Sequence, residues 1–149
     1  MKHTPPILLV EDNDDDAELT VRAFKEANIS NPVVRFEDGL KALDYLFCRG
    51  PHADRDPREG PAVVLLDLKL PRLSGIDVLR AVRADERTKN LPVVILTSST
   101  EDRDRMAAYR HNANSYVQKP VDYDQFVTAA RQLGLYWMVL NVPPPDGTL

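Results

Sequence analysis

Five polar residues, spread along the chain, are of the types that can together transfer a phosphoryl group. Three are carboxylates, one is a hydroxyl and one is an ammonium group: Glu11, Asp12, Asp67, Thr97 and Lys119. Carboxylates gathered at one point repel each other, and one stays protonated unless a cation lies between them. Oxygen ligands suit the hard cation Mg²⁺, which shares its remaining positions with water and phosphate oxygens. With the lysine and threonine nearby, these carboxylates would surround a transferring phosphoryl group, and Asp67 would be its nucleophile.

The segments before these residues predict how they are brought together. Five short aliphatic runs alternate with segments of helical spacing, and the runs cover residues 7–10, 33–36, 62–66, 92–96 and 115–118. Strands that alternate with helices indicate a parallel sheet with helices on both faces. In a chain of 149 residues, an open doubly wound sheet is favoured over a barrel, which needs about 250 residues. The predicted fold class is therefore α/β, with a five-stranded parallel sheet and five helices.

Each of the five polar residues follows or ends a predicted strand. Ligands of an open parallel sheet bind outside the carboxyl ends of its strands. Taken singly, Thr97 is an ordinary strand residue and Lys119 an ordinary surface lysine. Glu11 and Asp12 taken alone fit a solvated acidic turn before the first helix. Asp67 is harder to explain in this way because it ends the apolar run VVLL, and the position of all five at one edge favours a functional site.

An alternative for the acidic run DNDDD is a calcium-binding loop. Asp12, Asp14 and Asp16 stand at the first, third and fifth positions of an EF-hand loop. The sixth position is Ala17, where glycine is required, and the twelfth is Ala23, where a bidentate glutamate is expected. The match fails at both residues that define the geometry. We therefore expect the three consecutive aspartates to cap the first helix and to complement its dipole, with no metal role.

The composition excludes several other classes of function. The formal net charge is −4, so the chain offers no basic surface for nucleic acid. The single cysteine, Cys48, excludes an internal disulfide. No apolar run approaches the roughly 18 residues of a membrane span, and the N-terminus is too polar for a signal peptide. We expect a soluble, cytoplasmic protein with no nucleic-acid and no membrane partner.

The pattern of strands and helices predicts one domain over residues 1–142. Prolines keep residues 143–149 from continuing a helix, so a tail and no output domain are expected there. The polar, proline-rich segment 49–61 is predicted to be an exposed loop after the second helix. The segment 133–140, LGLYWMVL, is apolar around much of its circumference, which is more than a one-sided helix needs. Such a surface favours self-association, so a homodimer is expected.

Four stretches of the sequence resemble the receiver domain of two-component response regulators. They are LLVEDN (8–13), LLDLKLPRLSG (65–75), VVILTSS (93–99) and YVQKPV (116–121), and the resemblance covers roughly residues 5–140. It implies a flavodoxin-like fold with strand order 2-1-3-4-5 and a histidine kinase as the partner. The stretches RADERTKNLPVVILTSS, NANSYVQKPVD and LYWMVLNVP resemble the stand-alone receivers that partner bacterial phytochrome histidine kinases, which implies a role in light signalling.

The resemblance also implies a role for each residue of the candidate site. Asp67 would be the phosphoacceptor, and Lys119 would pair with the phosphoryl oxygens. Asp12 would bind Mg²⁺ directly and Glu11 through water, while Lys69 would contribute its main-chain carbonyl. The chain would catalyse only its own phosphorylation and dephosphorylation, so it would not be an enzyme acting on a separate substrate.

Two further residues would pass the signal on. Thr97 would move to hydrogen-bond the phosphoryl group, and Tyr116 would swing inward behind it, which repacks helix four, strand five and helix five. We expect the homodimer to use this surface together with the C-terminal segment. The chain departs from the family's pattern at Lys69 and Ser99, because neither is an acid or amide suited to orient an attacking water molecule. Slow self-dephosphorylation is therefore expected.

Two alternatives remain open. A haloacid-dehalogenase-like, Mg²⁺-dependent phosphatase also uses an aspartate nucleophile, but it needs a second aspartate two residues later, where this chain has Lys69. A pseudo-receiver that acts only as a binding module would not need the five site residues, all of which are present. Stable phosphorylation of Asp67 would separate the receiver from both.

Overall fold

The computed structural model describes residues 4–99, 101–119 and 122–134. In chain order its elements are β1 (Ile7–Val10), α1 (Asp14–Glu26), β2 (Val33–Phe36), α2 (Gly39–Leu46), the 3₁₀ helix η1 (Gly50–His52), β3 (Val63–Leu66), α3 (Gly75–Ala84), β4 (Val93–Thr97), α4 (Asp102–Arg110), β5 (Ser115–Gln118) and α5 (Tyr123–Gly134). The strands pair in parallel, in the order β2-β1-β3-β4-β5. The predicted fold class and strand order are confirmed.

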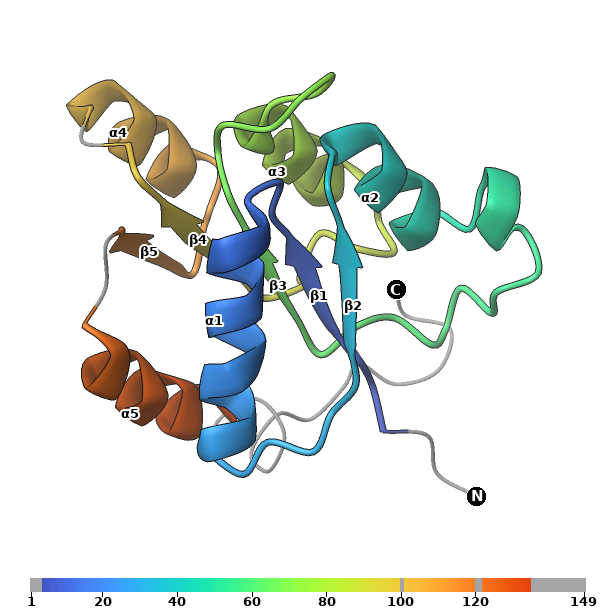
Figure 1. Ribbon diagram of the computed structural model, residues 1–149. Helices are drawn as coiled ribbons and strands as arrows, with labels where there is room; N and C mark the ends of the chain where they lie inside the picture. The colour runs from blue at the N-terminus through green and yellow to red at the C-terminus, as the bar shows by residue number, and fades with distance from the viewer. Residues whose placement is uncertain (1–3, 100, 120–121, 135–149) are drawn as a thin grey trace.

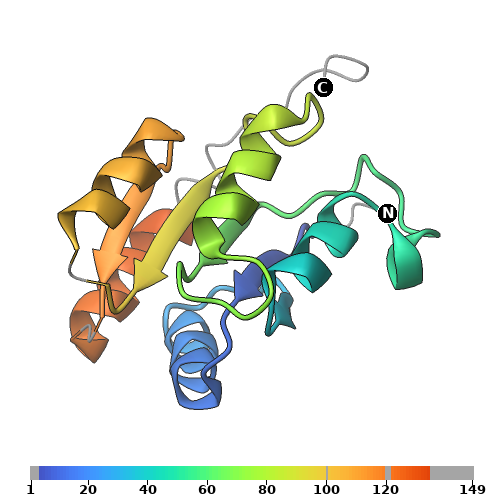
Figure 2. The ribbon, with the colours of Figure 1, turned by 90° about the horizontal axis from the view of Figure 1, so that it is seen from above.

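The sheet separates two layers of helices. Helices α1 and α5 cover one face, and α2, α3 and α4 cover the other (Figures 1 and 2). Strands β1, β3 and β4 are buried along their whole length, because their aliphatic side chains alternate between the two layers. Leu8 packs in one core with residues of α2 and α3, whereas its neighbour Leu9 packs in the other with residues of α1 and α5. The edge strands β2 and β5 are only partly buried.

Side-chain caps fix where three of the helices begin at the edges of the sheet. Asn13 accepts the backbone N–H of Asp16 at the start of α1, at 2.9 Å. Asp38 caps α2 and Ser74 caps α3 in the same way. The cap of α1 is thus Asn13 and not, as the acidic run predicts, one of the three aspartates, because these form the first turn of the helix. In that turn they still complement the helix dipole.

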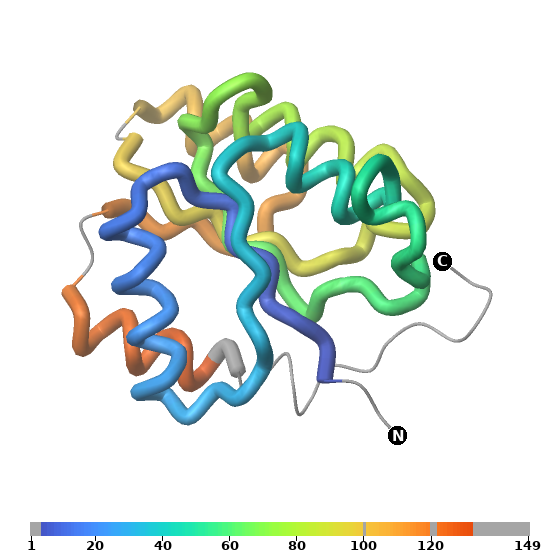
Figure 3. Tube along the Cα trace, turned by 45° about the vertical axis from the view of Figure 1, so that its right-hand side comes forward, coloured from blue at the N-terminus to red at the C-terminus, as the bar shows by residue number. Residues whose placement is uncertain are grey.

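The segment 49–61 is largely exposed, as its polar composition predicts, but some of its side chains pack against neighbouring elements. The guanidinium carbon of Arg55 lies 4.3 Å from the ring centroid of Tyr45, and Nη2 of Arg55 donates to the Tyr45 carbonyl at 2.7 Å. The ring of His52 packs edge-on against Tyr45 and Phe36. Arg55 and His52 therefore tie the middle of this segment to its neighbours, and Figure 3 shows the segment running from the end of α2 to the start of β3.

Some predictions fall on parts of the chain outside the described residues. Helix α5 is described as far as Gly134, so most of the apolar segment 133–140, the boundary at residue 142 and the tail 143–149 lie outside them. Among the helices that the structure describes, none is long and apolar enough to cross a membrane.

Candidate functional site

The strand register brings Glu11 and Asp67 side by side. Val10 pairs with Leu66 at the ends of β1 and β3, and the backbone N–H of Asp67 donates to the Val10 carbonyl at 3.0 Å. Both acids are therefore the first residues beyond two neighbouring strands. Each of Glu11, Asp12 and Asp67 offers a carboxylate oxygen, and these oxygens lie within 4.8 Å of one another. The three acids meet at one edge of the sheet, as their positions after the strands predict.

The three carboxylates differ in their exposure. Glu11 is 1% exposed and Asp67 is 6% exposed, so Asp67 is covered although it stands at the rim of the sheet, whereas Asp12 is exposed. The pKa of Glu11 rises to about 7, chiefly because burial penalises its charged form and also because Asp67 repels it, while a hydrogen bond from Lys119 opposes this rise. A divalent cation would relieve that repulsion. An all-oxygen group open to solvent at Asp12 fits a hard cation such as Mg²⁺, which keeps water ligands.

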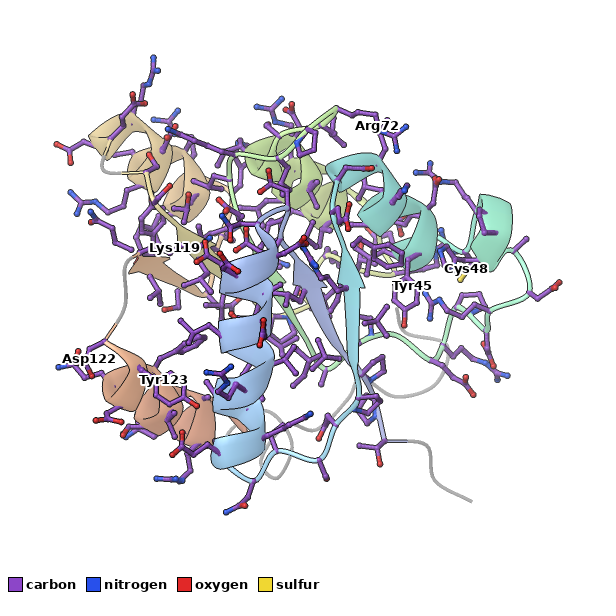
Figure 4. All side chains as sticks on the ribbon, viewed as in Figure 1. Tyr45, Cys48, Arg72, Lys119, Asp122 and Tyr123 are labelled. Carbon is purple, nitrogen blue, oxygen red and sulfur yellow. The ribbon has the colours of Figure 1, made fainter. Side chains whose placement is uncertain are left out.

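Lys119, which is labelled in Figure 4, directly follows β5 and contacts two of these acids. Its backbone N–H donates to the Thr97 carbonyl at 2.7 Å, which continues the pairing of β4 with β5. Its Nζ donates to Glu11 Oε1 at 2.5 Å, to Asp16 Oδ2 at 2.9 Å and to Asp67 Oδ2 at 3.0 Å. Burial alone would lower the pKa of Lys119, but these hydrogen bonds outweigh burial and raise the pKa above its usual value. A charged ammonium group therefore faces the carboxylate of Asp67.

Asp16 belongs to the site, although its sequence position predicts only a place in the first turn of a helix. Its carboxylate accepts a hydrogen bond from Lys119, so its role is not limited to the helix dipole. One signal in the sequence could have pointed to it. Helix α1 starts almost directly after β1, so its first turn stands over the same edge of the sheet as Glu11.

The loop between β3 and α3 is held close to Asp67. The backbone N–H of Lys69 donates to Asp67 Oδ1 at 3.2 Å, and the Lys69 residue is exposed. Gly75 approaches so closely that a β-carbon there would lie 2.1 Å from the Asp67 carbonyl oxygen, which explains a glycine at the start of α3. Arg72 ties the loop to the start of α2 through an ion pair with Asp38 at 2.8 Å. The backbone of Lys69 is therefore fixed beside Asp67.

A chain of hydrogen bonds runs from Thr97 to Tyr116. Thr97 is fully buried, and its hydroxyl accepts the backbone N–H of Ser99 at 3.3 Å. The Ser99 hydroxyl donates to Asp104 Oδ2 of α4 at 2.5 Å, and the Tyr116 hydroxyl donates to the Ser99 carbonyl at 3.4 Å. Ser99 thus links the end of β4 to both α4 and β5. The part played by Asp104 was not visible in the sequence, because an acid in the first turn of a helix is ordinary.

The chain is similar to known proteins over nearly its whole length. The family model of the response regulator receiver domain matches residues 7–131. Probable methanogenesis regulatory protein FilR2 of Methanothrix harundinacea is 38% identical over 138 residues, which are 93% of this chain and 86% of that protein. The structure of the bacteriophytochrome response regulator RtBRR is 49% identical with a TM-score of 0.77, covering 97% of this chain and 86% of that one. The structure of the phosphorylated cyanobacterial phytochrome response regulator RcpA is 31% identical with a TM-score of 0.82. The match covers 96% of this chain and 99% of that one.

These similarities extend over the residues that make up the site. The range matched by the family model includes Glu11, Asp12, Asp67, Thr97 and Lys119. The strand order, the acids at the carboxyl edge and the similarity over the whole fold agree with one another. The chain therefore belongs to the family of response regulator receiver domains.

Proposed function

We propose that this chain accepts a phosphoryl group from a histidine kinase on Asp67, in a Mg²⁺-dependent reaction of a two-component system. The observation that carries this proposal is the contact between Lys119 Nζ and Asp67 Oδ2 at 3.0 Å, inside an acidic group at the carboxyl edge of the sheet. A lysine–aspartate pair that only stabilised the fold would not require further carboxylates around it. Membership of the receiver family supports the same role.

We assign the cation to the acids at this edge and to one carbonyl group. Asp12 would bind Mg²⁺ directly and Glu11 through water, together with Asp67 and the main-chain carbonyl of Lys69. This donor set consists of oxygen atoms alone, which is the set that Mg²⁺ prefers. When bound, the cation would neutralise carboxylate charge and would bind oxygens of the phosphoryl group.

Asp67 is placed to act as the nucleophile. One of its carboxylate oxygens forms a bond to phosphorus while the bond from phosphorus to the kinase histidine breaks, and the imidazole keeps the electron pair. Lys119 already lies beside Asp67 and would stabilise the charge of the phosphoryl oxygens. The chain would thus catalyse its own phosphorylation and dephosphorylation and turn over no other substrate.

Thr97 and Tyr116 are proposed to carry the signal away from Asp67. Phosphorylation adds about −1.5 to −2 charges next to Lys119. When Thr97 turns toward the phosphoryl group, the hydroxyl gives up the N–H of Ser99. The Tyr116 hydroxyl donates to the carbonyl of the same Ser99. A shift of Ser99 would break this second bond and would allow the Tyr116 ring to move inward. The surface that changes is formed by α4, β5 and α5.

The phosphoryl group is expected to be lost slowly. Ser99 is buried and its hydroxyl is held by Asp104, while Lys69 offers a cation and neither an acid nor an amide. Neither residue is therefore suited to orient an attacking water molecule. A purified, phosphorylated sample is expected to retain its label over hours in Mg²⁺ buffer. Loss of the label within the first minute would contradict this proposal.

The partner is proposed from the relatives. RtBRR and RcpA are phytochrome response regulators by name, and we assign this chain to a light-signalling system with a bacteriophytochrome histidine kinase as its partner. A cytoplasmic location follows from such a partner.

We also propose that residues 1–142 form one receiver domain followed by the tail 143–149.

The surface of α4, β5 and α5, with the C-terminal segment, is proposed as a homodimer interface. Met106 is 60% exposed and Tyr109 is 51% exposed on α4, and the ring of Tyr109 lies 6.4 Å from that of Tyr116. Apolar and aromatic side chains at a surface favour association. Light scattering at micromolar concentration is expected to show a dimer, and a monomer both with and without a phosphoryl mimic would contradict it.

Intact mass spectrometry tests the central proposal. The wild type and Asp67→Asn are incubated with Mg²⁺ and acetyl phosphate, and one phosphoryl adduct is expected on the wild type alone. Asp54→Asn changes an exposed aspartate of the segment 49–61 and is expected to behave as the wild type. A pseudo-receiver would form no adduct, and a phosphatase would hydrolyse the donor continuously without a stable adduct.

A further inference from the structure

Lys119 is held by one carboxylate more than the proposed metal site includes. An ammonium group has three N–H donors, and here they meet three acceptors: Glu11 Oε1, Asp16 Oδ2 and Asp67 Oδ2. Glu11 and Asp67 belong to the acids whose oxygens lie close enough to share a cation, together with Asp12. Asp16 is not part of that group. It contacts the lysine from a different element, helix α1.

The backbone of Asp16 is fixed at both of its polar groups. Its N–H donates to the side chain of the cap residue Asn13 at 2.9 Å, and its carbonyl accepts the Thr20 hydroxyl at 2.8 Å. The Asp16 side chain is 39% exposed, compared with 12% for Lys119. The first turn of α1 therefore presents this carboxylate to Lys119 from a fixed backbone position, and the carboxylate is the more exposed of the two groups.

The three contacts of Lys119 respond differently to a cation in the site. A divalent cation held by Asp67 and, through water, by Glu11 would neutralise part of their negative charge and would repel the ammonium group. Two of the three contacts are then weakened at the moment when Lys119 is needed. The contact with Asp16 lies outside the metal-binding group, so its attraction is retained.

We propose that Asp16 is a positioning residue for phosphoryl acceptance, which keeps Lys119 Nζ beside Asp67 Oδ2 while the cation occupies the acids. The inference rests on the function proposed above. In the step itself, an Asp67 oxygen forms a bond to phosphorus, the bond from phosphorus to the leaving group breaks, and the leaving group keeps the electron pair. Asp16 exchanges no proton and touches no reacting atom. It acts by holding the ammonium group where the charge of the phosphoryl oxygens is stabilised.

Asp16→Ala removes this anchor, and Asp15→Ala is the matched control. Asp15 is an exposed residue of the same first turn, so α1 loses the same negative charge in both variants. With saturating Mg²⁺ and acetyl phosphate, the rate constant of phosphorylation is measured by intact mass spectrometry. We expect a decrease of about fivefold in Asp16→Ala and a change of less than about twofold in Asp15→Ala. Asp16→Glu keeps the carboxylate on a longer side chain and is expected to restore part of the loss.

A second measurement follows Lys119 directly and requires no phosphoryl transfer. The ¹⁵Nζ–H resonance of Lys119 is recorded in Mg²⁺-loaded protein and assigned by its absence in Lys119→Arg. Ammonium protons that are held by acceptors exchange slowly with water, so the resonance is expected in the wild type and in Asp15→Ala. In Asp16→Ala we expect it to be broadened or lost. A role of Asp16 in helix stability alone would not produce this difference from the control.

The outcomes distinguish this inference from the proposed function. If the wild type is phosphorylated and Asp16→Ala reacts equally fast or faster, Asp16 is not a positioning residue. An unchanged Lys119 resonance in Asp16→Ala overturns the inference as well. If the wild type acquires no phosphoryl group, the proposed function itself fails, and the resonance alone decides whether Asp16 holds the lysine.

Discussion

The two halves of the carboxyl edge are built differently. On the side of β1 and β3, helix α1 has a side-chain cap at Asn13 and buries several residues, among them Phe24. On the side of β4 and β5, helix α4, all of whose residues are described, begins without a side-chain cap and buries Ala108 alone. Its apolar side chains Met106 and Tyr109 are exposed. The half with the acids is firmly packed, whereas the half that leads from Thr97 to α4 is held more loosely.

This difference suits a chemical site that lies next to a switch. Firm packing keeps oxygen ligands and a nucleophile in one geometry. Elements that bury few apolar side chains change conformation at lower cost. Lys119 connects the two halves, because its backbone continues β5 and its ammonium group binds the acids beyond β1 and β3.

Removal of Lys119 is expected to have the largest effect, because it disconnects the two halves. Lys119→Ala is expected to slow phosphorylation by about 100-fold or more, since the phosphoryl oxygens lose their cation. Mg²⁺ is expected to bind more tightly, because a positive charge no longer repels it. Mass spectrometry and calorimetric titration measure the two effects. Lys89→Ala, which removes an exposed lysine paired with Glu86, is the control. An unchanged rate together with weaker Mg²⁺ binding would contradict this prediction.

The packing difference itself is tested by truncating one aromatic side chain in each half. Phe24 is 2% exposed, and its ring packs edge-on against Phe126 at 6.3 Å between centroids. Phe24→Ala is expected to lower the free energy of unfolding by about 3–4 kcal/mol. Tyr109→Ala is expected to change it by less than about 1 kcal/mol. Urea unfolding of both variants measures the difference, and equal losses would show that α4 is packed as firmly as α1.

The buried acid of the firmly packed half makes stability depend on pH. The folded-state pKa of Glu11 is about 7 and exceeds the ordinary value of 4.5. The folded protein therefore binds more protons than the unfolded chain between these values, so stability falls as pH rises through this window. Without Mg²⁺, Glu11→Gln is expected to be more stable than the wild type by about 1–3 kcal/mol at about pH 8, and equally stable at about pH 5.

Urea unfolding at the two pH values measures this effect. Glu18→Gln changes an exposed glutamate of α1 that pairs with Arg22, and it serves as the control without such a pH dependence. A gain in Glu11→Gln of the same size at both pH values would show that the titration of Glu11 is not its cause.

Replacement of Thr97 is expected to have the smallest effect on the rate of phosphorylation. Thr97 is itself buried, but it stands where the loosely held half toward α4 begins. Thr97→Ala is expected to accept the phosphoryl group to nearly the wild-type extent. The conformational change at Tyr116 is expected to be weak, because alanine has no hydroxyl that could leave the Ser99 N–H and turn toward the phosphoryl group. Ring resonances of Tyr116 are compared before and after addition of beryllofluoride. Thr4→Ala, at an exposed position before β1, is the control. The same change at Tyr116 in Thr97→Ala and in the wild type would refute the coupling.

The strands and the residues that follow them could be predicted because both are local patterns. An aliphatic run such as VVLL predicts a buried strand, and the residue after it must stand at the edge where parallel strands end. Asp16 and Asp104 could not be found in this way. Each is an acid in the first turn of a helix, and only the position of that helix over the sheet brings it to Lys119 or to Ser99. The cap at Asn13 was missed for a related reason, since several adjacent residues were equally good candidates.

The sequence by itself determined the α/β class, the order of the elements and the residues that stand at the carboxyl edge. These depend on periodicities and strand ends that extend over a few neighbouring residues. The tertiary structure decided which acids share Lys119, how deeply Glu11 is buried and how α4 differs from α1. Lys119 meets Glu11 across 108 positions of the chain and Asp67 across 52. Hydrogen bonds and burial over such separations are set by strand register and helix packing, which no local pattern contains.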